Sequence, residues 1–417
     1  MPVPSRQFVL IDHSIEDAAG HHLEYARRVL GAAKAEGFRT VLAVNERAKL
    51  LDCPEADSVF KSFSRTCWEM QAQHVHRTLV GFALRRDAMT ADPLKVDRFT
   101  SELAALIREA EVTEADIVFV PTLGGAEAIA ISAYSSSGGA QPLHWHLLFR
   151  RDVAPSASRT KPREAIVRWR IQSALARAAR RFRSGVRYLY TDTEELTQRY
   201  NSLGTGSFQT LPIPIDERLR LKRPHGGNGP LVVSYVGDMR DEKGIDLLPG
   251  IISSLRRAGY DKAKVLFRIQ SNLPATGVSR KTRHVKEALQ KARQNGVELV
   301  EGPLSSDAYM DLMLHSDVLL IPYSPIHYAA RSSGVFVEAI AAGIPTVHPR
   351  ESWMGRNAKD KLGFGYSTPI EITQGIENLI DHYPRYEQCS REYGPEWRER
   401  HSARRLAKIL IENQGCV

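Results

Sequence analysis

The chain has 417 residues, of which 42% are apolar, and its formal net charge is +9. This length and composition predict two globular domains and exclude a fibrous repeat or a disordered chain. No stretch approaches the ~20 apolar residues of a membrane-spanning helix. The four cysteines lack a metal-binding spacing and the N-terminus lacks the apolar core of a secretory signal, so we expect a cytoplasmic protein.

The excess positive charge lies in one segment. Between Arg150 and Arg187 there are twelve cations and two acids. The surplus of twelve minus two positive charges in this segment exceeds the net charge of +9 of the whole chain. The pattern predicts a helix from Arg163 to Arg183 with one apolar stripe. Such a helix can rest on an anionic membrane surface, or it can pack on a core with a solvated cationic face. The aromatic residues of a nucleic-acid stacking platform are nearly absent, so we expect no nucleic-acid partner.

The first half of the chain alternates between apolar runs and helical patterns. Phe8–Asp12 is predicted to be a buried strand, followed by Gly20-His-His and a helix. Further strands are predicted at Phe38–Val44, Asp116–Val120, Leu143–Phe149 and Arg187–Tyr190. This alternation predicts a doubly wound parallel sheet, with the region 51–101 left unassigned.

A cluster of Gly, Pro and polar residues from Lys222 to Pro230 predicts a domain boundary and hinge. A second α/β series follows it. Its strands are predicted at Leu231–Val236, Val265–Ile269, Val297–Val300 and Asp317–Ile321. The fold class is therefore α/β, with two Rossmann-like domains.

Ligands bind such sheets at the carboxyl ends of the strands, where two loops carry suitable residues. The loop from Gly237 to Gly244 places Arg240 and Lys243 around a tight turn. An arginine fork and a lysine point charge suit a pyrophosphate. Taken alone, the same loop equally fits a solvated turn whose own acidic residues neutralise the two cations.

The second loop, Arg331-Ser332-Ser333-Gly334, leads into a predicted helix that contains Glu338. A helix N-terminus with a glycine can approach a phosphate closely, and a carboxylate one turn further can accept hydrogen bonds from both hydroxyls of a ribose. A capped helix with an exposed glutamate is the simpler alternative for either feature taken singly.

Together these loops resemble the donor-binding half of family 4 glycosyltransferases, which have the GT-B fold. The resemblance covers roughly Leu231–Val347: a strand ends in Gly237, Lys243-Gly244 follows, an aspartate-led strand ends at Pro322, and Gly334 leads to Glu-Ala-x-Ala-x-Gly-x-Pro. Two positions depart from the pattern. Asp238 stands where a basic residue is usual, and Ala330 stands eight positions before Glu338, where the family commonly has a first glutamate.

The resemblance implies two domains facing each other across a cleft. The acceptor-side domain would span 1–222, the donor domain 223–385, and a final helical stretch, 386–417, would cross back to the first domain. The implied reaction moves a sugar from a UDP- or GDP-sugar to a carbohydrate or lipid-linked acceptor hydroxyl, with retention and without a metal or other cofactor. A role in surface polysaccharide or glycolipid synthesis would fit.

The predicted site has two parts. The catalytic candidates are His146, Arg240 and Lys243. The donor-binding candidates are Gly20, His21, Gly237, Arg331, Ser332, Ser333, Gly334 and Glu338. The resemblance places a sugar-contacting histidine near the strand that holds His146, although a structural histidine fits that position equally well.

Three other functions compete with this one. A non-catalytic GT-B homologue that acts as a scaffold or regulatory subunit is suggested by Ala330. A nicotinamide dehydrogenase is disfavoured, because no strand opens into Gly-x-Gly-x-x-Gly with an acidic residue about 20 positions later. A basic adaptor would depend on the cationic segment rather than on the two loops.

Overall fold

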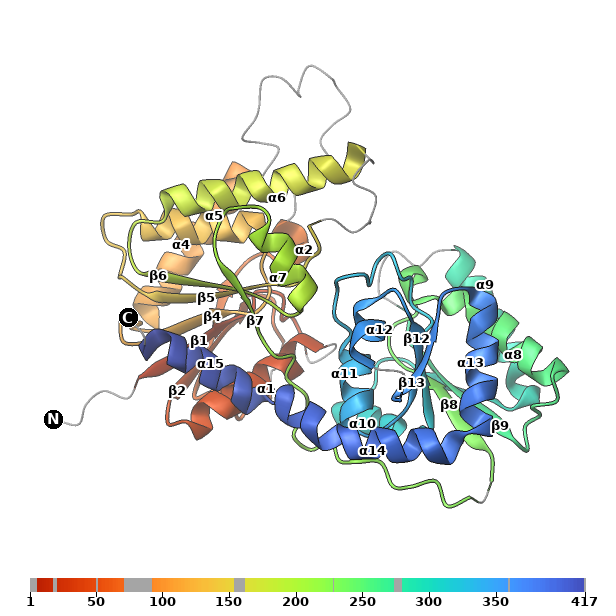
Figure 1. The fold of residues 1–417 in the computed structure, drawn as a ribbon. Coiled ribbons are helices and arrows are strands. Elements are labelled where there is room, and N and C mark those ends of the chain that lie inside the picture. The colour runs from red at the N-terminus through yellow and green to blue at the C-terminus, as the bar shows by residue number, and fades with distance from the viewer. Residues whose placement is uncertain are drawn as a thin grey trace. The chain divides into compact units, whose positions relative to one another are not determined.

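A computed structural model describes residues 6–17, 21–49, 52–70, 92–153, 162–227, 229–273, 280–358 and 361–415, without the side chains of residues 21, 162–168, 170, 280 and 281. The chain forms two compact units. The first comprises Met1–Pro214 and Ala403–Val417, and the second comprises Ile215–Ser402 (Figure 1).

The first unit is built on a seven-stranded sheet in the order β3-β2-β1-β4-β5-β6-β7, in which every neighbouring pair is parallel. Its strands are β1 (Gln7–Ile11), β2 (Arg39–Asn45), β3 (Ser58–Phe63), β4 (Ile117–Val120), β5 (His144–Phe149), β6 (Val186–Thr191) and β7 (Phe208–Thr210). Its helices are α1 (His21–Ala35), α2 (Cys67–Met70), α4 (Pro93–Glu109), α5 (Gly125–Ser135), α6 (Pro162–Arg181), α7 (Glu194–Asn201) and α15 (Ala403–Gly415).

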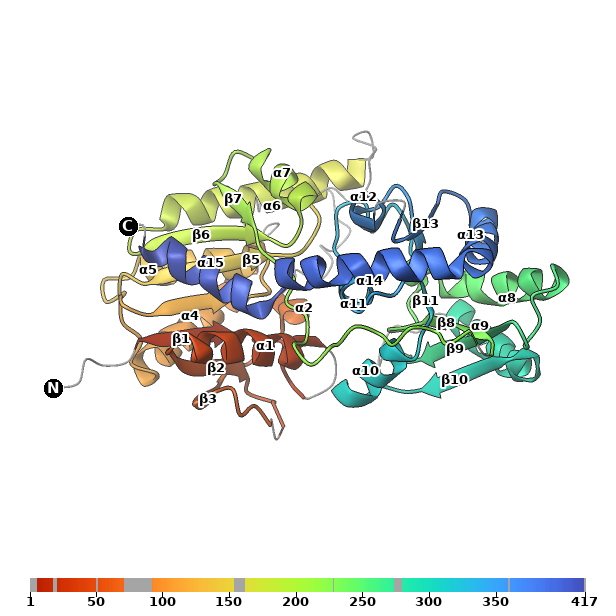
Figure 2. The ribbon, with the colours of Figure 1, turned by 60° about the horizontal axis from the view of Figure 1, so that its bottom comes forward.

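Helices cover both faces of this sheet. Helices α4, α5 and α6 pack side by side on one face, and α1 and α15 pack together on the other (Figures 1 and 2). Leu406 and Leu410 of α15 belong to the same core cluster as Phe8, Leu42 and Phe119 of the sheet. The last helix of the chain is thus an integral part of the first unit, because its apolar face completes that core.

The second unit has a six-stranded parallel sheet in the order β10-β9-β8-β11-β12-β13. Its strands are β8 (Leu231–Tyr235), β9 (Val265–Ser271), β10 (Val297–Glu301), β11 (Val318–Leu320), β12 (Thr346–Pro349) and β13 (Gly363–Tyr366). Its helices are α8 (Leu248–Arg257), α9 (Arg280–Lys291), α10 (Ser306–Leu314), α11 (Gly334–Ala341), α12 (Trp353–Ala358), α13 (Pro369–Asp381) and α14 (Tyr383–Arg400). The prediction of two doubly wound, Rossmann-like domains is confirmed.

The sequence placed boundaries after residues 222 and 385, whereas the two units divide after Pro214 and Ser402. Lys222 explains the first difference, because its buried ammonium lies 2.8 Å from Asp317 and 3.1 Å from Glu387 within the second unit. The second difference concerns α14, which packs within the second unit: its Trp397 indole donates a 3.0 Å hydrogen bond to the carbonyl of Val337 in α11. Packing therefore assigns both segments to the second unit.

The strand order of the second sheet identifies a candidate place for a ligand. From β8 the chain moves outward to β9 and β10, and then returns to β11 on the other side of β8. The connections after β8 and β11 therefore run in opposite directions, and in open sheets of this kind ligands bind at the carboxyl ends of two such strands. Both predicted loops, 237–244 and 331–338, follow these two strands.

Candidate functional site

Two glycines shape the loop that follows β8. Gly237 has a φ of +113°, and a Cβ there would lie 2.9 Å from the Lys243 ammonium. Gly244 has a φ of +67°, and a Cβ there would lie only 1.8 Å from the carbonyl oxygen of Pro322, directly after β11. The absence of side chains at both positions lets the loop fold tightly and touch the neighbouring loop.

Lys243 projects into this junction. Its Nζ lies 5.7 Å from the centre of the Tyr323 ring, and this ammonium makes no hydrogen bond or ion pair to another residue that the structure describes. Burial, together with the nearby Arg240 and Arg331 guanidinium groups, outweighs the opposing acidic neighbours and lowers the pKa of Lys243 to about 8. An ammonium held out of water in this way gains strongly from an anionic ligand.

Arg240 is in a different situation, because two acids of its own loop surround it. Its guanidinium donates to Asp238 at 2.6 Å and lies 3.6 Å from Glu242. Asp238 is itself held by the side-chain amide of Asn272 at 2.9 Å. The sequence left open that acidic residues of this loop neutralise both of its cations. The structure shows that they neutralise Arg240 but form no ion pair with Lys243.

The loop that follows β11 ends at the N-terminus of α11. The buried Ser333 caps this helix by accepting from the amide of Phe336 at 3.3 Å. Gly334 is exposed, and a Cβ there would meet nothing within 4 Å. Ser332 is partly buried, and Arg331 places its guanidinium over the ring of Tyr328 at 5.0 Å. An open helix N-terminus beside a cation is a favourable place for a phosphate.

Glu338 lies in the second turn of α11 and is only 9% exposed. Its Oε2 accepts a 2.6 Å hydrogen bond from the hydroxyl of Tyr309 in α10. The first turn of α11 touches the other loop, since a Cβ on Gly237 would lie 4.0 Å from a methyl of Val335. The structure thus brings Gly237, Lys243, Arg331, Ser332, Ser333, Gly334 and Glu338 to one edge of the second sheet.

The remaining predicted residues belong to the first unit. Gly20 lies outside the described residues, and His21 is described only as the first residue of α1. His146 lies inside β5 and is fully buried, with its ring 4.5 Å from that of Tyr188 and its Nδ1 3.0 Å from the Tyr190 hydroxyl. Burial lowers the pKa of His146 to about 3. We therefore leave His146 out of the proposed site, because a neutral, stacked core histidine does not reach a strand end.

Sequence reasoning did not group five polar residues that the first unit brings together. They come from the carboxyl ends of three strands and from the start of α1, and they are Asp12, His22, Tyr25, Arg150 and Asp192. His22 Nδ1 lies 2.8 Å from Asp12, and the Arg150 guanidinium lies 4.1 Å from the centre of the Tyr25 ring and 4.0 Å from Asp192. The available signal was the position of three of them: Asp12 ends the first predicted strand, Arg150 directly follows another, and Asp192 lies two residues after a third.

The Asp12–His22 pair of this group keeps its charges although both residues are largely buried. Burial raises the pKa of Asp12, but His22, His13 and the Ser14 amide together lower it more, so the net pKa lies below its ordinary value. Burial lowers the pKa of His22, but Asp12 raises it more, so the net pKa of the imidazole is raised. A charged pair beside an arginine and a second carboxylate offers both donors and acceptors to a polar ligand.

The predicted basic helix is α6, and its described half shows two faces. Ala174, Leu175 and Ala178 are buried, whereas Arg180, Arg181 and Arg183 at its end are exposed and Trp169 is 43% exposed. No helix among the described residues has the length and apolar character needed to cross a membrane. Within the same residues, no group of three or more His, Cys, Asp or Glu side chains is placed to hold a metal ion.

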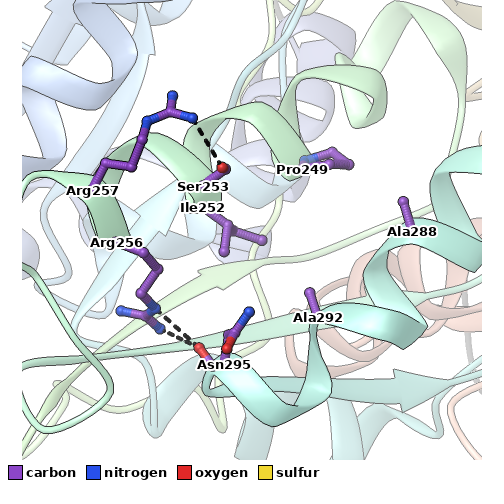
Figure 3. Close-up of a pocket in the computed structure, with 8 residues that line it drawn as sticks. All are labelled: Pro249, Ile252, Ser253, Arg256, Arg257, Ala288, Ala292 and Asn295. Atoms are coloured by element: carbon purple, nitrogen blue, oxygen red, sulfur yellow. Dashed lines mark hydrogen bonds between the residues drawn. The ribbon is translucent and has the colours of Figure 1, made fainter.

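A surface hollow of about 370 Å³ lies between α8 and α9 (Figure 3). Arg256 donates to the carbonyl of Asn295 at 2.7 Å, and Arg257 donates to Ser253 at 3.4 Å. The hollow contains none of the residues at the strand ends, so we do not assign it to the site. It is lined by Pro249, Ile252, Ser253, Arg256, Arg257, Ala288, Ala292 and Asn295.

Two doubly wound parallel sheets, with a terminal helix that belongs to the first, constitute the GT-B fold. The structure is similar to the sucrose-phosphate synthase of Thermosynechococcus elongatus (13% identity, TM-score 0.64, 99% of this chain and 98% of that one). It is also similar to Anabaena Alr3699/HepE in complex with UDP-glucose (12%, 0.64, 99% and 100%) and to the trehalose-6-phosphate synthase OtsA (13%, 0.66, 99% and 99%). No family model matches the sequence, and a search of curated proteins finds no match. The predicted GT-B fold is confirmed.

Proposed function

We propose that this protein is a glycosyltransferase that binds a nucleoside diphosphate sugar at the strand ends of its second unit and transfers the sugar to an acceptor hydroxyl. One observation carries the proposal. Lys243 and Arg331 converge there with the N-terminus of α11, and both cations rest on tyrosine rings rather than on carboxylates. Similar structures include that of Anabaena Alr3699/HepE in complex with UDP-glucose.

Each part of the donor has a matching feature in this site. The diphosphate would lie against Lys243 and the first turn of α11, where Gly334 permits close approach. The ribose would lie at Glu338, whose carboxylate accepts hydrogen bonds from hydroxyls. Negative charge grows on the leaving diphosphate as the glycosidic bond breaks, and these positive groups stabilise it without a metal ion. The paired Arg240 would lie at the rim of the site.

On the acceptor side, we assign the hydroxyl-binding role to the polar group of the first unit. Asp192 and the Asp12–His22 pair can accept hydrogen bonds from a carbohydrate, while Arg150 and Tyr25 can donate them. A carbohydrate or lipid-linked acceptor, as in surface polysaccharide or glycolipid synthesis, fits this chemistry. The resemblance to family 4 implies retention, which the anomeric configuration of the product would test by NMR.

The proposal can be tested by thermal shift with UDP, GDP, ADP and their common sugars. A ligand that binds only the folded state raises the melting temperature by mass action. We expect one diphosphate series to stabilise the wild type and to lose this effect in Lys243→Ala and Glu338→Ala. Arg257→Ala is a matched control, because it removes a cation of the same unit at the hollow of Figure 3. If no nucleotide shifts the wild type, the proposed function is wrong.

A non-catalytic nucleotide-sugar-binding subunit is the second candidate, and Ala330 favours it. Ala330 is fully buried in the loop before α11, so no carboxylate projects from this position toward the donor sugar. The two candidates differ in turnover. Sugar transfer or donor hydrolysis above background, abolished by Lys243→Ala, would eliminate the binding subunit, whereas nucleotide-sugar binding with neither activity would favour it.

Helix α6 supports a peripheral contact with anionic lipid at the cytoplasmic face of a membrane. Its exposed arginines attract anionic head groups, and the exposed Trp169 suits the interfacial layer. Co-sedimentation with phosphatidylglycerol vesicles, but not with phosphatidylcholine vesicles, would support the contact. Replacing Arg180, Arg181 and Arg183 by Gln should abolish that binding; retained binding would exclude α6 as the contact.

A further inference from the structure

Two buried tyrosines lie in the loop that joins β11 to α11. The ring centres of Tyr323 and Tyr328 are 4.6 Å apart, and each residue is less than 5% exposed. Each ring carries one cation: the Lys243 ammonium lies 5.7 Å from the centre of Tyr323, and the Arg331 guanidinium lies 5.0 Å from the centre of Tyr328. A pair of touching rings therefore connects the two cations that face the donor site.

An aromatic ring holds a cation differently from a carboxylate. The negative face of the ring attracts the cation and orders its side chain, but the ring adds no net charge that would cancel it. Arg240, a few residues from Lys243, illustrates the contrast, since Asp238 and Glu242 neutralise it. The two tyrosines keep Lys243 and Arg331 in place while leaving their positive charge available to an anion.

The same rings connect the cations to the start of α11. The Tyr323 hydroxyl lies within hydrogen-bonding reach of the Ser333 side chain, the residue that caps this helix. Tyr328 is held in turn by a contact at its own backbone, where its carbonyl accepts from the amide of Trp353 at 3.0 Å. The Tyr323 side chain thus relates the ring pair to one helix N-terminus, and the backbone of Tyr328 is anchored beside it.

We propose that Tyr323 and Tyr328 are positioning residues that hold Lys243 and Arg331 as a preorganised, un-neutralised pair for the diphosphate of the donor. This inference rests on the proposed function and deepens it. The two long cationic side chains would already be ordered in the ligand-free protein, so binding the diphosphate would cost less side-chain conformational entropy. Removing a ring should therefore weaken recognition of the diphosphate and leave recognition of the nucleoside unchanged.

The test compares Tyr328→Phe, which keeps the ring, with Tyr328→Leu and Tyr328→Met, which remove it. Calorimetry would give the Kd of each variant for UDP and GDP and, as uncharged probes, for uridine and guanosine. We expect Tyr328→Phe to bind the preferred diphosphate within about twofold of wild type, and the variants without a ring to bind it about three- to tenfold more weakly. Nucleoside binding should stay unchanged in all three variants.

Two further readouts separate positioning from a general loss of structure. The melting temperature without ligand shows whether a variant is folded, and Tyr328→Met serves if the leucine variant is not. The salt dependence of diphosphate binding should become shallower when the ring is removed, because a disordered Arg331 contributes less. Equal weakening of diphosphate and nucleoside, or no weakening of either, would overturn the inference. If the wild type binds none of UDP, GDP and ADP, the proposed function fails and takes this inference with it; if ADP is the preferred diphosphate, ADP and adenosine replace the other probes.

Discussion

The hydroxyl of Tyr309 donates a 2.6 Å hydrogen bond to Oε2 of Glu338. The two residues lie on α10 and α11, helices that follow different strands of the second sheet. A short bond from a hydroxyl to a carboxylate is among the stronger hydrogen bonds in proteins. It fixes the direction of the Glu338 carboxylate, which we assign to the ribose of the donor.

Tyr309→Phe should therefore weaken binding of the preferred nucleoside diphosphate by about three- to tenfold, or ~1 kcal/mol. The reason is that the Glu338 carboxylate can then rotate away from the ribose. Calorimetry with the diphosphate and with its 2′-deoxy analogue would measure the effect. The 2′-deoxy ligand should be affected less than the ribose form, and a loss equal for both ligands would contradict the assignment of Glu338 to the ribose hydroxyls.

The depressed pKa of Lys243 predicts a pH dependence of donor binding. Its ordinary value is 10.5, and burial lowers the pKa to about 8 in the ligand-free protein. Only the protonated ammonium attracts the diphosphate, so affinity should be constant below pH 7 and fall as pH rises through about 8. Lys243→Arg, which stays charged throughout, should show a flat profile between pH 7 and pH 9. A flat profile in the wild type would exclude Lys243 as a titrating contact of the diphosphate.

Two glycines of the site should respond oppositely to replacement by alanine. Gly334→Ala should leave the melting temperature unchanged or slightly raised, because a Cβ there meets nothing within 4 Å and alanine favours a helix. It should nevertheless weaken diphosphate binding by about tenfold, since the methyl would occupy the approach of the phosphate. Unchanged binding would place the phosphate elsewhere.

Gly244→Ala is the matched contrast within the same site. Its Cβ would lie 1.8 Å from the Pro322 carbonyl oxygen, and its φ of +67° is already unfavourable for alanine. We expect a loss of about 2 to 4 kcal/mol in the free energy of unfolding. Chemical denaturation would measure this loss, and a stability equal to that of Gly334→Ala would show that the two loops do not touch as described.

The buried His146 predicts an acid sensitivity of folding that is separate from ligand binding. Its pKa falls from the ordinary 6.5 to about 3 in the folded protein because burial excludes the charged form. Between these values the unfolded chain binds a proton that the folded chain does not, so stability falls as pH drops from about 6.5 toward 3. His146→Phe should remove about 3 kcal/mol of the destabilisation between pH 6.5 and pH 4. Urea denaturation at both pH values would measure it, and an unchanged pH dependence would contradict the neutral, buried histidine.

The sequence by itself determined the fold class and the positions of four of the six strands of the second sheet. Strands such as Leu231–Tyr235 and Val318–Leu320 were predictable because a parallel strand buried on both faces is a mainly apolar run. The two loops of the second unit were predictable for a related reason. Each is a short segment, the first directly after β8 and the second directly before α11, and the glycines and cations of each lie close together in the chain.

Only the tertiary structure decided which of these charges is available and what holds it. Lys243 and Arg240 are three residues apart, yet one rests on Tyr323 and the other is paired with Asp238. The polar group of the first unit, the place of His146 inside its sheet and the boundary at Pro214 were likewise beyond the sequence. All of them depend on side chains that meet only when segments far apart in the chain pack together, and burial, which sets their charge states, is a property of that packing.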